Sequence, residues 1–266
     1  MTNHTEQTST SYVAKKPDEN GFINYDATEN AVWHDLYKRQ ITIVHRYACS
    51  EYTQGLTTLN LTTDRIPQCS EINQKLQQTT GWQVEPVPAL IPHDYFFKLL
   101  SQRKFPAATF IRRREEFNYI QEPDIFHEYF GHCPMLTNPI YADFMHAYGH
   151  LGLNTRNPQH QQLLARLYWF TVEFGLIQTP QGKLCYGGGI LSSPEETVYA
   201  IDSDIPKRLA FNLLDVLRTP YRIDIKQPIY FVINDFEELY DLIRQDITQL
   251  LEQAIALGEF EPCYSL

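Results

Sequence analysis

The spacing of apolar residues predicts a chain built mostly from helices. From Asp26 onward, residues such as Val32 and Leu36 recur at helical intervals, which predicts a long first helix reaching to about residue 48. Ser70 is a suitable N-terminal cap for the next helix, and Gly81 is a suitable stop. The same reasoning predicts further helices over 92–104, 124–133, 139–153, 158–177, 192–201 and, as one long amphipathic element, 235–257.

Extended structure is expected in fewer places. Three prolines between residues 82 and 92 favour an extended loop, because proline lacks a backbone donor and restricts the residue before it. The segment 105–112 has the composition of a short strand, and 221–233 alternates like strands. We therefore predict a mainly α single domain of packed helices over residues 21–266, with a small β component. Residues 1–20, rich in threonine and serine, are expected to form a disordered tail.

Composition and charge narrow the class of protein. Hydrophobic residues make up 43% of the chain and charged residues 20%, which excludes disorder over most of its length. The net charge of −10 argues against nucleic acid or an acidic membrane surface as the main partner. The five cysteines are widely spaced without a C-x-x-C pair, as expected for reduced thiols in a cytoplasm. With neither a signal peptide nor a membrane-spanning apolar run, the sequence predicts a cytoplasmic protein.

The segment His-Glu-Tyr-Phe-Gly-His carries the clearest candidate chemistry. It begins at His127 and ends at His132, and it looks at first like the H-E-x-x-H motif of zinc proteases. Here, however, the second histidine follows five positions after the first, which on an ideal α-helix rotates it by about 140°. Gly131 is placed to end or bend the helix and return the second imidazole toward the first. The spacing argues against a zinc protease and permits a shared metal, and two unrelated surface histidines remain the simpler alternative.

A metal held by two histidines needs a further ligand, and Glu173 is the candidate. Its neighbours on the same helical face, including Trp169 and Phe170, are apolar. A carboxylate on such a face is costly unless it pairs with a cation or binds a metal. A salt bridge to Arg166 or to another arginine explains the pattern equally well. Two histidines and one carboxylate, without cysteine, form the arrangement that suits Fe(II) and leaves positions open for O₂.

His146 and His150 form a rival pair. They are four positions apart and would face the same way on a helix. Gly149 lies between them and Asp143 is the only local acid, so we interpret both as solvated surface histidines.

Two other classes of protein are compatible with these residues. One is a zinc hydrolase built on His127, Glu128 and His132, which would contain zinc, cleave amide bonds and take up no O₂. The other is a non-catalytic helical binding protein, which would retain no metal after chelation and dialysis. Metal analysis followed by O₂ consumption would separate both classes from an oxygenase.

Four longer segments carry a resemblance to a known family. They are PVPALI at 86–91, EPDIFHEYFGHCP at 122–134, YWFTVEFGL at 168–176 and YGGGILSS at 186–193. In these segments, their order and their separations, the chain resembles the pterin-dependent aromatic amino acid hydroxylases. It is most similar to the bacterial members that act on phenylalanine, and the resemblance extends from about residue 26 to about residue 256.

The resemblance implies a non-haem Fe(II) monooxygenase that uses O₂ and a tetrahydropterin, tetrahydrobiopterin or a related compound, to hydroxylate phenylalanine to tyrosine. It matches His127, His132 and Glu173 to the iron ligands. Its partners would be the small molecules phenylalanine, O₂ and reduced pterin. We expect the catalytic domain alone, without the regulatory domain and tetramerising helix of the animal enzymes, and therefore a monomer or weak homodimer.

The resemblance also implies the residues that hold the substrate. Arg112 matches the arginine that pairs with the substrate carboxylate, where a planar guanidinium makes two parallel hydrogen bonds. Pro123 and Trp169 match pocket walls against the substrate ring, while Ser192 and Ser193 match a loop near its amino-acid end. From the residues alone, Arg112 is one charge in a solvated run and the serines are helix caps.

On the pterin side, Phe96 matches the ring that stacks on the cofactor, and Glu128 matches a glutamate that faces it. Weaker matches to pterin contacts are Ile91, His93, Ala165 and Tyr168. Asp124 is expected to orient a ligand histidine through an outer hydrogen bond, and capping the helix of the histidine motif is an equally good role for it.

Overall fold

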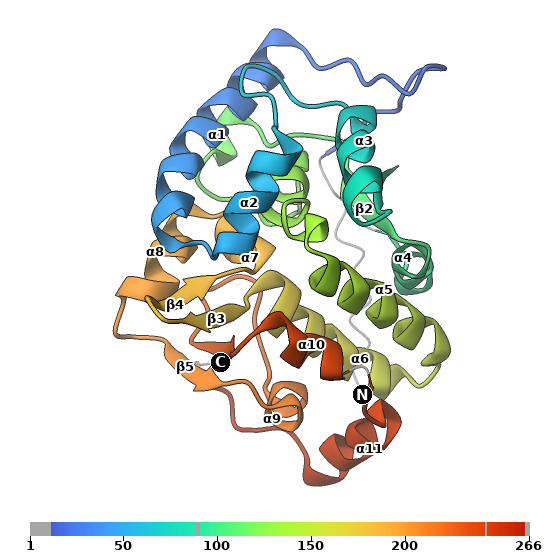
Figure 1. Ribbon diagram of the computed structural model, residues 1–266, viewed down its shortest axis with the longest axis vertical. Coiled ribbons are helices and arrows are strands. Elements are labelled where there is room, and N and C mark those ends of the chain that lie inside the picture. Colours follow the sequence, from blue (N-terminus) through green and yellow to red (C-terminus); the bar gives the residue numbers. More distant parts are fainter. Residues whose placement is uncertain (1–11, 89–90, 243, 264–266) are drawn as a thin grey trace.

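The computed structural model describes residues 12–88, 91–242 and 244–263 (Figure 1). Its first helix, α1 (Ala27–Tyr47), begins where the sequence predicts. Asp26 caps it by accepting hydrogen bonds from amides of the first turn, and the Glu29 carboxylate accepts one in return from the Asp26 amide. The apolar face of α1, with Trp33 near its centre, is fully buried. Local sequence signals and packing agree in this helix.

The helices of the described residues pack around one continuous core, and α5 crosses the middle of the molecule (Figure 1). The helices after α1 are α2 (Ser50–Leu59), α3 (Cys69–Thr79), α4 (His93–Ser101), α5 (Pro139–Asn154), α6 (Pro158–Tyr168), α7 (Gly188–Leu191), α8 (Pro194–Asp202), α9 (Leu213–Arg218), α10 (Phe236–Leu242) and α11 (Ile247–Leu257). The prediction of a mainly helical single domain is confirmed.

Two small sheets complete the fold. In the first, β1 (Gln83–Val87) pairs in parallel with β2 (Lys104–Ala108). The second has the order β4 (Gly182–Cys185), β3 (Leu176–Thr179), β6 (Ile229–Ile233) and β5 (Lys207–Ala210). Every residue of β6 is buried, as expected for a central strand covered on both faces.

Several predicted boundaries need correction. The helix predicted over 158–177 is α-helical only to Tyr168, and its last apolar residues belong to β3. The long helix predicted over 235–257 is divided into α10 and α11, and Asp246 begins the second by accepting a hydrogen bond from the Gln249 amide. Apolar periodicity continues across both breaks, so it gave no sign of them.

Caps and strands also differ from the prediction. The cap of α3 is Gln68 rather than Ser70, because the Glu71 carboxylate accepts a hydrogen bond from the Gln68 amide. Part of the loop predicted over 82–92 forms β1, where Pro86 is tolerated in a two-stranded sheet. Only the last part of 221–233 is a strand, and β5 was not predicted.

The structure describes only part of the expected N-terminal tail. Half of the expected tail, residues 1–11, lies outside the described residues. Residues 12–20 contain no helix or strand, but Tyr12 stacks on Phe110 at 4.3 Å between ring centroids and Lys15 pairs with Glu29. Among the described helices, none has the length and apolar character needed to cross a bilayer.

Candidate metal centre and active site

A π-helical turn brings the two histidines of the motif together. Residues His127–His132 form this turn, in which the Cys133 amide bonds the Glu128 carbonyl five residues earlier at 3.1 Å. In a π-helix, residues five apart lie one above the other, and such turns occur frequently at functional sites. The Nε2 atoms of His127 and His132 are therefore only 2.9 Å apart. The sequence predicted that Gly131 would end or bend the helix, but the helix widens instead.

Close packing of α7 against this turn leaves no room for a side chain at Gly131 or Gly188. A Cβ atom on Gly131 would lie 2.7 Å from the carbonyl oxygen of Gly188, and one on Gly188 would lie 2.4 Å from ring atoms of His132. Both distances are shorter than real Cβ contacts allow. The motif helix and the Tyr186–Ser193 segment therefore touch through backbone, and this contact fixes the His132 ring.

Glu173 reaches the histidines from a second π-helical turn. Residues Trp169–Glu173 continue α6, and the Phe174 amide bonds the Trp169 carbonyl at 2.9 Å. The Glu173 carboxylate lies 3.2 Å from His132 Nε2 and 3.7 Å from His127 Nε2. The alternative partner, Arg166, bonds the Leu217 carbonyl and Glu259 instead. The geometry therefore resolves the two explanations in favour of the histidine cluster.

These three side chains fit a metal ion. Within the described residues they are the only group of three His, Cys, Asp or Glu with ligand atoms close enough, all within 4.8 Å of one another. Ligands bound at about 2.1 Å and at right angles would lie about 3 Å apart, close to the shorter separations seen here. A set of two imidazole nitrogens and one carboxylate, without sulfur, is the ligand set of non-haem Fe(II) sites.

The electrostatics of the cluster favour the ligand forms of His127 and Glu173. Burial lowers the pKa of His127 to about 4, so its imidazole is neutral at pH 7. Burial opposes ionisation of Glu173, but the two histidines and the Gly189 amide hold its pKa below the usual value. Neutral imidazoles and an ionised carboxylate are the forms that bind metals.

The rival pair lacks the third ligand. His146 Nε2 lies 3.0 Å from the Ser101 carbonyl oxygen and 3.2 Å from His150 Nε2. Asp143 pairs with Arg103, and among the described residues no third ligand completes this pair. His150 is exposed and His146 is partly buried, so the prediction of solvated surface histidines describes the first better than the second.

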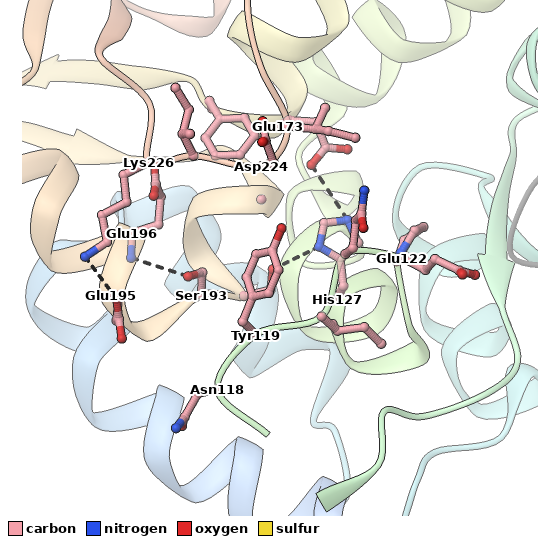
Figure 2. A pocket seen from close by; sticks show the side chains of 18 of the residues that line it. Asn118, Tyr119, Glu122, His127, Glu173, Ser193, Glu195, Glu196, Asp224 and Lys226 are labelled. Carbon is pink, nitrogen blue, oxygen red and sulfur yellow. Dashed lines mark hydrogen bonds and ion pairs between the residues drawn. The ribbon is translucent and has the colours of Figure 1, made fainter. Parts of the chain in front are cut away.

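Two of the three ligands, His127 and Glu173, line a cavity of about 530 Å³. In Figure 2, the side chains of His127 and Glu173 face one another at its wall. Five of the sequence-predicted substrate residues line the same cavity: Arg112, Pro123, Trp169, Ser192 and Ser193. The structure thus brings the predicted ligands and the predicted substrate residues into one space.

Arg112 is held in place by Asp124. Its Nε and Nη2 atoms bond the two carboxylate oxygens at 2.7 and 2.9 Å, and both side chains are buried. This leaves Nη1 without a hydrogen bond to any other described residue, on a side chain that lines the cavity. Burial alone would raise the pKa of Asp124, but the charge and hydrogen bonds of Arg112 keep it low. The guanidinium is thus pre-oriented for a second carboxylate.

Asp124 and the two serines have contacts that the sequence did not resolve. Asp124 accepts a hydrogen bond from the His127 amide at 3.0 Å, which is the capping role, and the contact to a ligand ring comes from Ser192 instead. The Ser192 hydroxyl lies 2.9 Å from His127 Nδ1. Ser193 caps α8 through the Glu196 amide.

The residues matched to pterin contacts lie outside the lining of this cavity, as far as the described residues go. Phe96 is partly buried in α4 and its ring meets Tyr168 edge-on at 5.4 Å. Burial and the nearby charges of Glu173 and Asp124 raise the pKa of Glu128 well above its usual value. The remaining three matches are Ile91 and Ala165, which are partly buried, and His93, which is exposed.

Comparison with known proteins identifies the family. The family model described as biopterin-dependent aromatic amino acid hydroxylase matches residues 2–263. The chain belongs to this family. This aromatic amino acid hydroxylase is 56% identical to phenylalanine-4-hydroxylase of Pseudomonas aeruginosa over 96% of the chain and 97% of the relative. Membership of this family excludes the two alternative classes, the zinc hydrolase and the non-catalytic binding protein.

Solved structures of similar proteins have the same fold, and one of them contains bound iron. The hydroxylase matches the apo structure of the cold active phenylalanine hydroxylase from Colwellia psychrerythraea with a TM-score of 0.92 and 54% identity, over 94% of this chain and 97% of that chain. It also matches Chromobacterium violaceum phenylalanine hydroxylase with bound oxidised Fe(III), with a TM-score of 0.87 and 43% identity, over 89% and 86% of the two chains.

The structure adds cavity residues that the sequence did not single out. Two of them, Glu195 and Glu196, lie in α8. The others come from the loop before the histidine motif and from the loop before β6: Asn118, Tyr119, Ile120, Gln121, Ile223, Asp224, Ile225 and Lys226. The first loop directly precedes the EPDIFHEYFGH motif, and this adjacency was a usable signal. The second loop was taken as part of a strand, and nothing in its pattern pointed to the site.

Proposed function

We propose that the protein is a phenylalanine 4-monooxygenase, which converts phenylalanine to tyrosine with O₂ and a tetrahydropterin. The observation that carries this function is the convergence of His127, His132 and Glu173 beside a cavity whose lining includes His127, Glu173, Arg112 and Trp169. The similarity to bacterial phenylalanine-4-hydroxylases over nearly the whole chain supports the same reaction.

We assign the metal to His127, His132 and Glu173. Bound there, Fe(II) together with the reduced pterin supplies O₂ activation and the electrons that hydroxylation consumes. The protein keeps the ligands fixed: Ser192 orients the His127 ring through Nδ1, and the Gly189 amide hydrogen-bonds the Glu173 carboxylate. Such outer contacts set the orientation of metal ligands.

We assign the aromatic amino acid to the cavity. Arg112, already oriented by Asp124, would bind the substrate carboxylate through its remaining N–H groups. Pro123 and Trp169 would hold the ring between them and exclude water from the reacting carbon. The substrate thereby reaches the metal with its polar end bound and its ring directed inward.

We assign the pterin to the side of Phe96, whose ring would stack on the cofactor. Burial raises the pKa of Glu128, which favours the protonated form that could donate a hydrogen bond to a pterin heteroatom. Weaker contacts are proposed for Ile91, His93, Ala165 and Tyr168. Phe96 and Tyr168 already pack together, which preforms part of an aromatic surface.

We also propose that the enzyme acts in the cytoplasm as a monomer or weak homodimer. The apolar face of α11, with Ile247, Leu251 and Ala254 buried, packs within the protomer against α9 and α6. This helix therefore uses its apolar surface internally rather than between subunits. Sedimentation velocity over a range of protein concentrations tests this state, and a stable tetramer would contradict it.

The decisive experiment combines metal and cofactor dependence. Metal-stripped protein reloaded with Fe(II) should form tyrosine from phenylalanine only when tetrahydrobiopterin and O₂ are both present. The zinc-loaded protein should be folded and inactive, because zinc has no redox chemistry. Tyrosine formation without pterin, or by the zinc form, would refute the function.

Ligand variants test the metal assignment separately. His132→Ala and Glu173→Ala should each lose iron and activity, whereas His146→Ala should retain both. Loss of iron from His146→Ala with retention by His132→Ala would show that the ligand assignment is wrong.

A further inference from the structure

Gln227 occupies a junction behind the cavity. The residue immediately precedes the Pro228–β6 segment, and it is 1% exposed. Its side-chain oxygen accepts a hydrogen bond from the indole Nε1 of Trp169 at 3.0 Å. Its amide nitrogen donates to the carbonyl oxygens of Arg222 and Ile225 at 2.9 and 3.0 Å. Three hydrogen bonds from one buried side chain therefore join two parts of the chain 58 residues apart.

Both parts of the chain that Gln227 joins are walls of the cavity. Trp169 lies four residues before the metal ligand Glu173, and its ring stacks on Tyr221 with centroids 4.5 Å apart and planes 16° apart. The loop around Arg222 and Ile225 contributes four consecutive residues, 223–226, to the cavity lining. The position of one wall is therefore tied to the other through a single amide group.

The backbone of Gln227 is anchored to a third part of the cavity. Its amide donates to the Glu196 carboxylate at 3.0 Å, and the Tyr230 hydroxyl donates to the same oxygen. Glu196 belongs to α8, whose first turn lies at the cavity. Figure 2 shows Glu196 next to Ser193, the residue that caps this helix. Gln227 is thus held from α8 on one side and holds Trp169 on the other.

We propose that Gln227 is a positioning residue for the aromatic substrate: its side chain fixes the Trp169 ring and the 222–226 loop at the spacing that grips the substrate ring. The inference deepens the proposed hydroxylase function and rests on it for the identity of the substrate. Removing the side-chain amide takes a hydrogen-bond partner from the Trp169 indole N–H and from two backbone carbonyls, all of them partly buried, and such losses are costly. These groups regain partners only if the walls move or water enters, and either change loosens the substrate site.

The test compares Gln227→Leu with Gln40→Leu. Gln40 is a matched control because it is equally buried and its side chain also makes hydrogen bonds, to Leu191 and Thr197 rather than to a cavity wall. Both variants should lose stability in urea unfolding. Only Gln227→Leu should raise the KM for phenylalanine and its calorimetric Kd, by about tenfold, as expected when a buried hydrogen bond to the binding surface is lost. It should also lower the fraction of oxidised pterin that yields tyrosine.

A double-mutant cycle with Trp169→Phe tests the route of the effect. The phenyl side chain introduced by Trp169→Phe keeps the cavity wall aromatic. It lacks the indole N–H that donates a hydrogen bond to Gln227. The effects of the two substitutions on Kd should therefore be less than additive. If Gln227→Leu fails to fold, Gln227→Glu keeps the acceptor and loses the amide donors, and it should also raise the Kd for phenylalanine above that of the wild type.

The outcomes separate this inference from the function. Equal Kd and KM changes in Gln227→Leu and Gln40→Leu, or full additivity with Trp169→Phe, would overturn the positioning role while the wild-type enzyme still makes tyrosine. A wild-type protein that binds phenylalanine but makes no tyrosine would overturn the function and leave the binding comparison valid.

Discussion

Replacing Gly188 by alanine should damage the metal centre without touching a ligand. Gly188 begins α7, so alanine suits its backbone and would favour the helix by about 0.5–1 kcal/mol. The added Cβ, however, would lie 2.4 Å from Cε1 and Nδ1 of His132, whereas ordinary contact begins at 3.4 Å. The imidazole must therefore move by about 1 Å.

The His132 ring has little room for such a movement. It is 2% exposed, and the ring of Phe105 lies against it with centroids 5.2 Å apart. Metal and catalytic sites tolerate displacements of about 0.5 Å, and a displacement of 1 Å costs on the order of a hundredfold. We expect Gly188→Ala to bind divalent metal about a hundredfold more weakly and to lose about 1–3 kcal/mol of stability through overpacking.

Metal affinity is measured by calorimetric titration of the metal-stripped protein with Co²⁺, a redox-stable substitute for Fe(II), and stability by urea unfolding. Gly152→Ala is the matched control, because its Cβ would meet the Phe97 ring at 2.0 Å, between α5 and α4 and away from the ligands. It should lose stability and keep its affinity for Co²⁺. Wild-type affinity in Gly188→Ala would refute the reasoning that α7 fixes the ligand ring.

Three further substitutions test other parts of the site. Arg112→Lys should raise the KM for phenylalanine at least about tenfold because lysine cannot form the two-pronged contact, whereas Arg114→Lys on the surface should be nearly neutral in the same steady-state assay. Equal effects would remove Arg112 from the substrate site. Phe96→Ala should weaken pterin binding more than phenylalanine binding in calorimetry, and the reverse order would remove Phe96 from the pterin site. Burial raises the pKa of Glu196, so the folded state disfavours its ionised form and loses stability as pH rises through that pKa. Glu196→Gln keeps an acceptor for its two donors and should be more stable than the wild type at pH 8 and equal near pH 4 in urea unfolding, while a constant difference across pH would contradict this.

The sequence predicted the elements that local interactions determine. The start of α1 follows from Asp26 and Glu29, which cap it within one turn, and its buried face follows from apolar periodicity. The motif residues were found for a related reason, since the metal ligands and their neighbours are contiguous segments. Where the break in a helix depends on a residue in the same turn, as with Asp246, a closer reading of caps would have found it.

Long-range contacts decided the parts that the sequence left open. Periodicity could not choose between Arg166 and a metal as the partner of Glu173, because the choice depends on Glu259, 93 residues away from Arg166. The loop that ends at Gln227 escaped notice because its contact with Trp169 joins residues 58 positions apart. The π-helical turns were not predicted either, since the widened geometry of the first is supported by packing against α7 rather than by local composition.

The two π-helical turns give the site an unusual relation between chain length and geometry. A π-turn accommodates one more residue than an α-turn before the chain returns to the same face. Five positions between His127 and His132 in this helix are therefore equivalent in space to four positions in an α-helix. The histidine motif of this oxygenase contains one residue more than the H-E-x-x-H motif of the hydrolases. The wider backbone hydrogen-bond pattern of the π-helix accommodates the extra residue. A search by residue spacing alone separates the two motifs, whereas a search by ligand geometry brings them together.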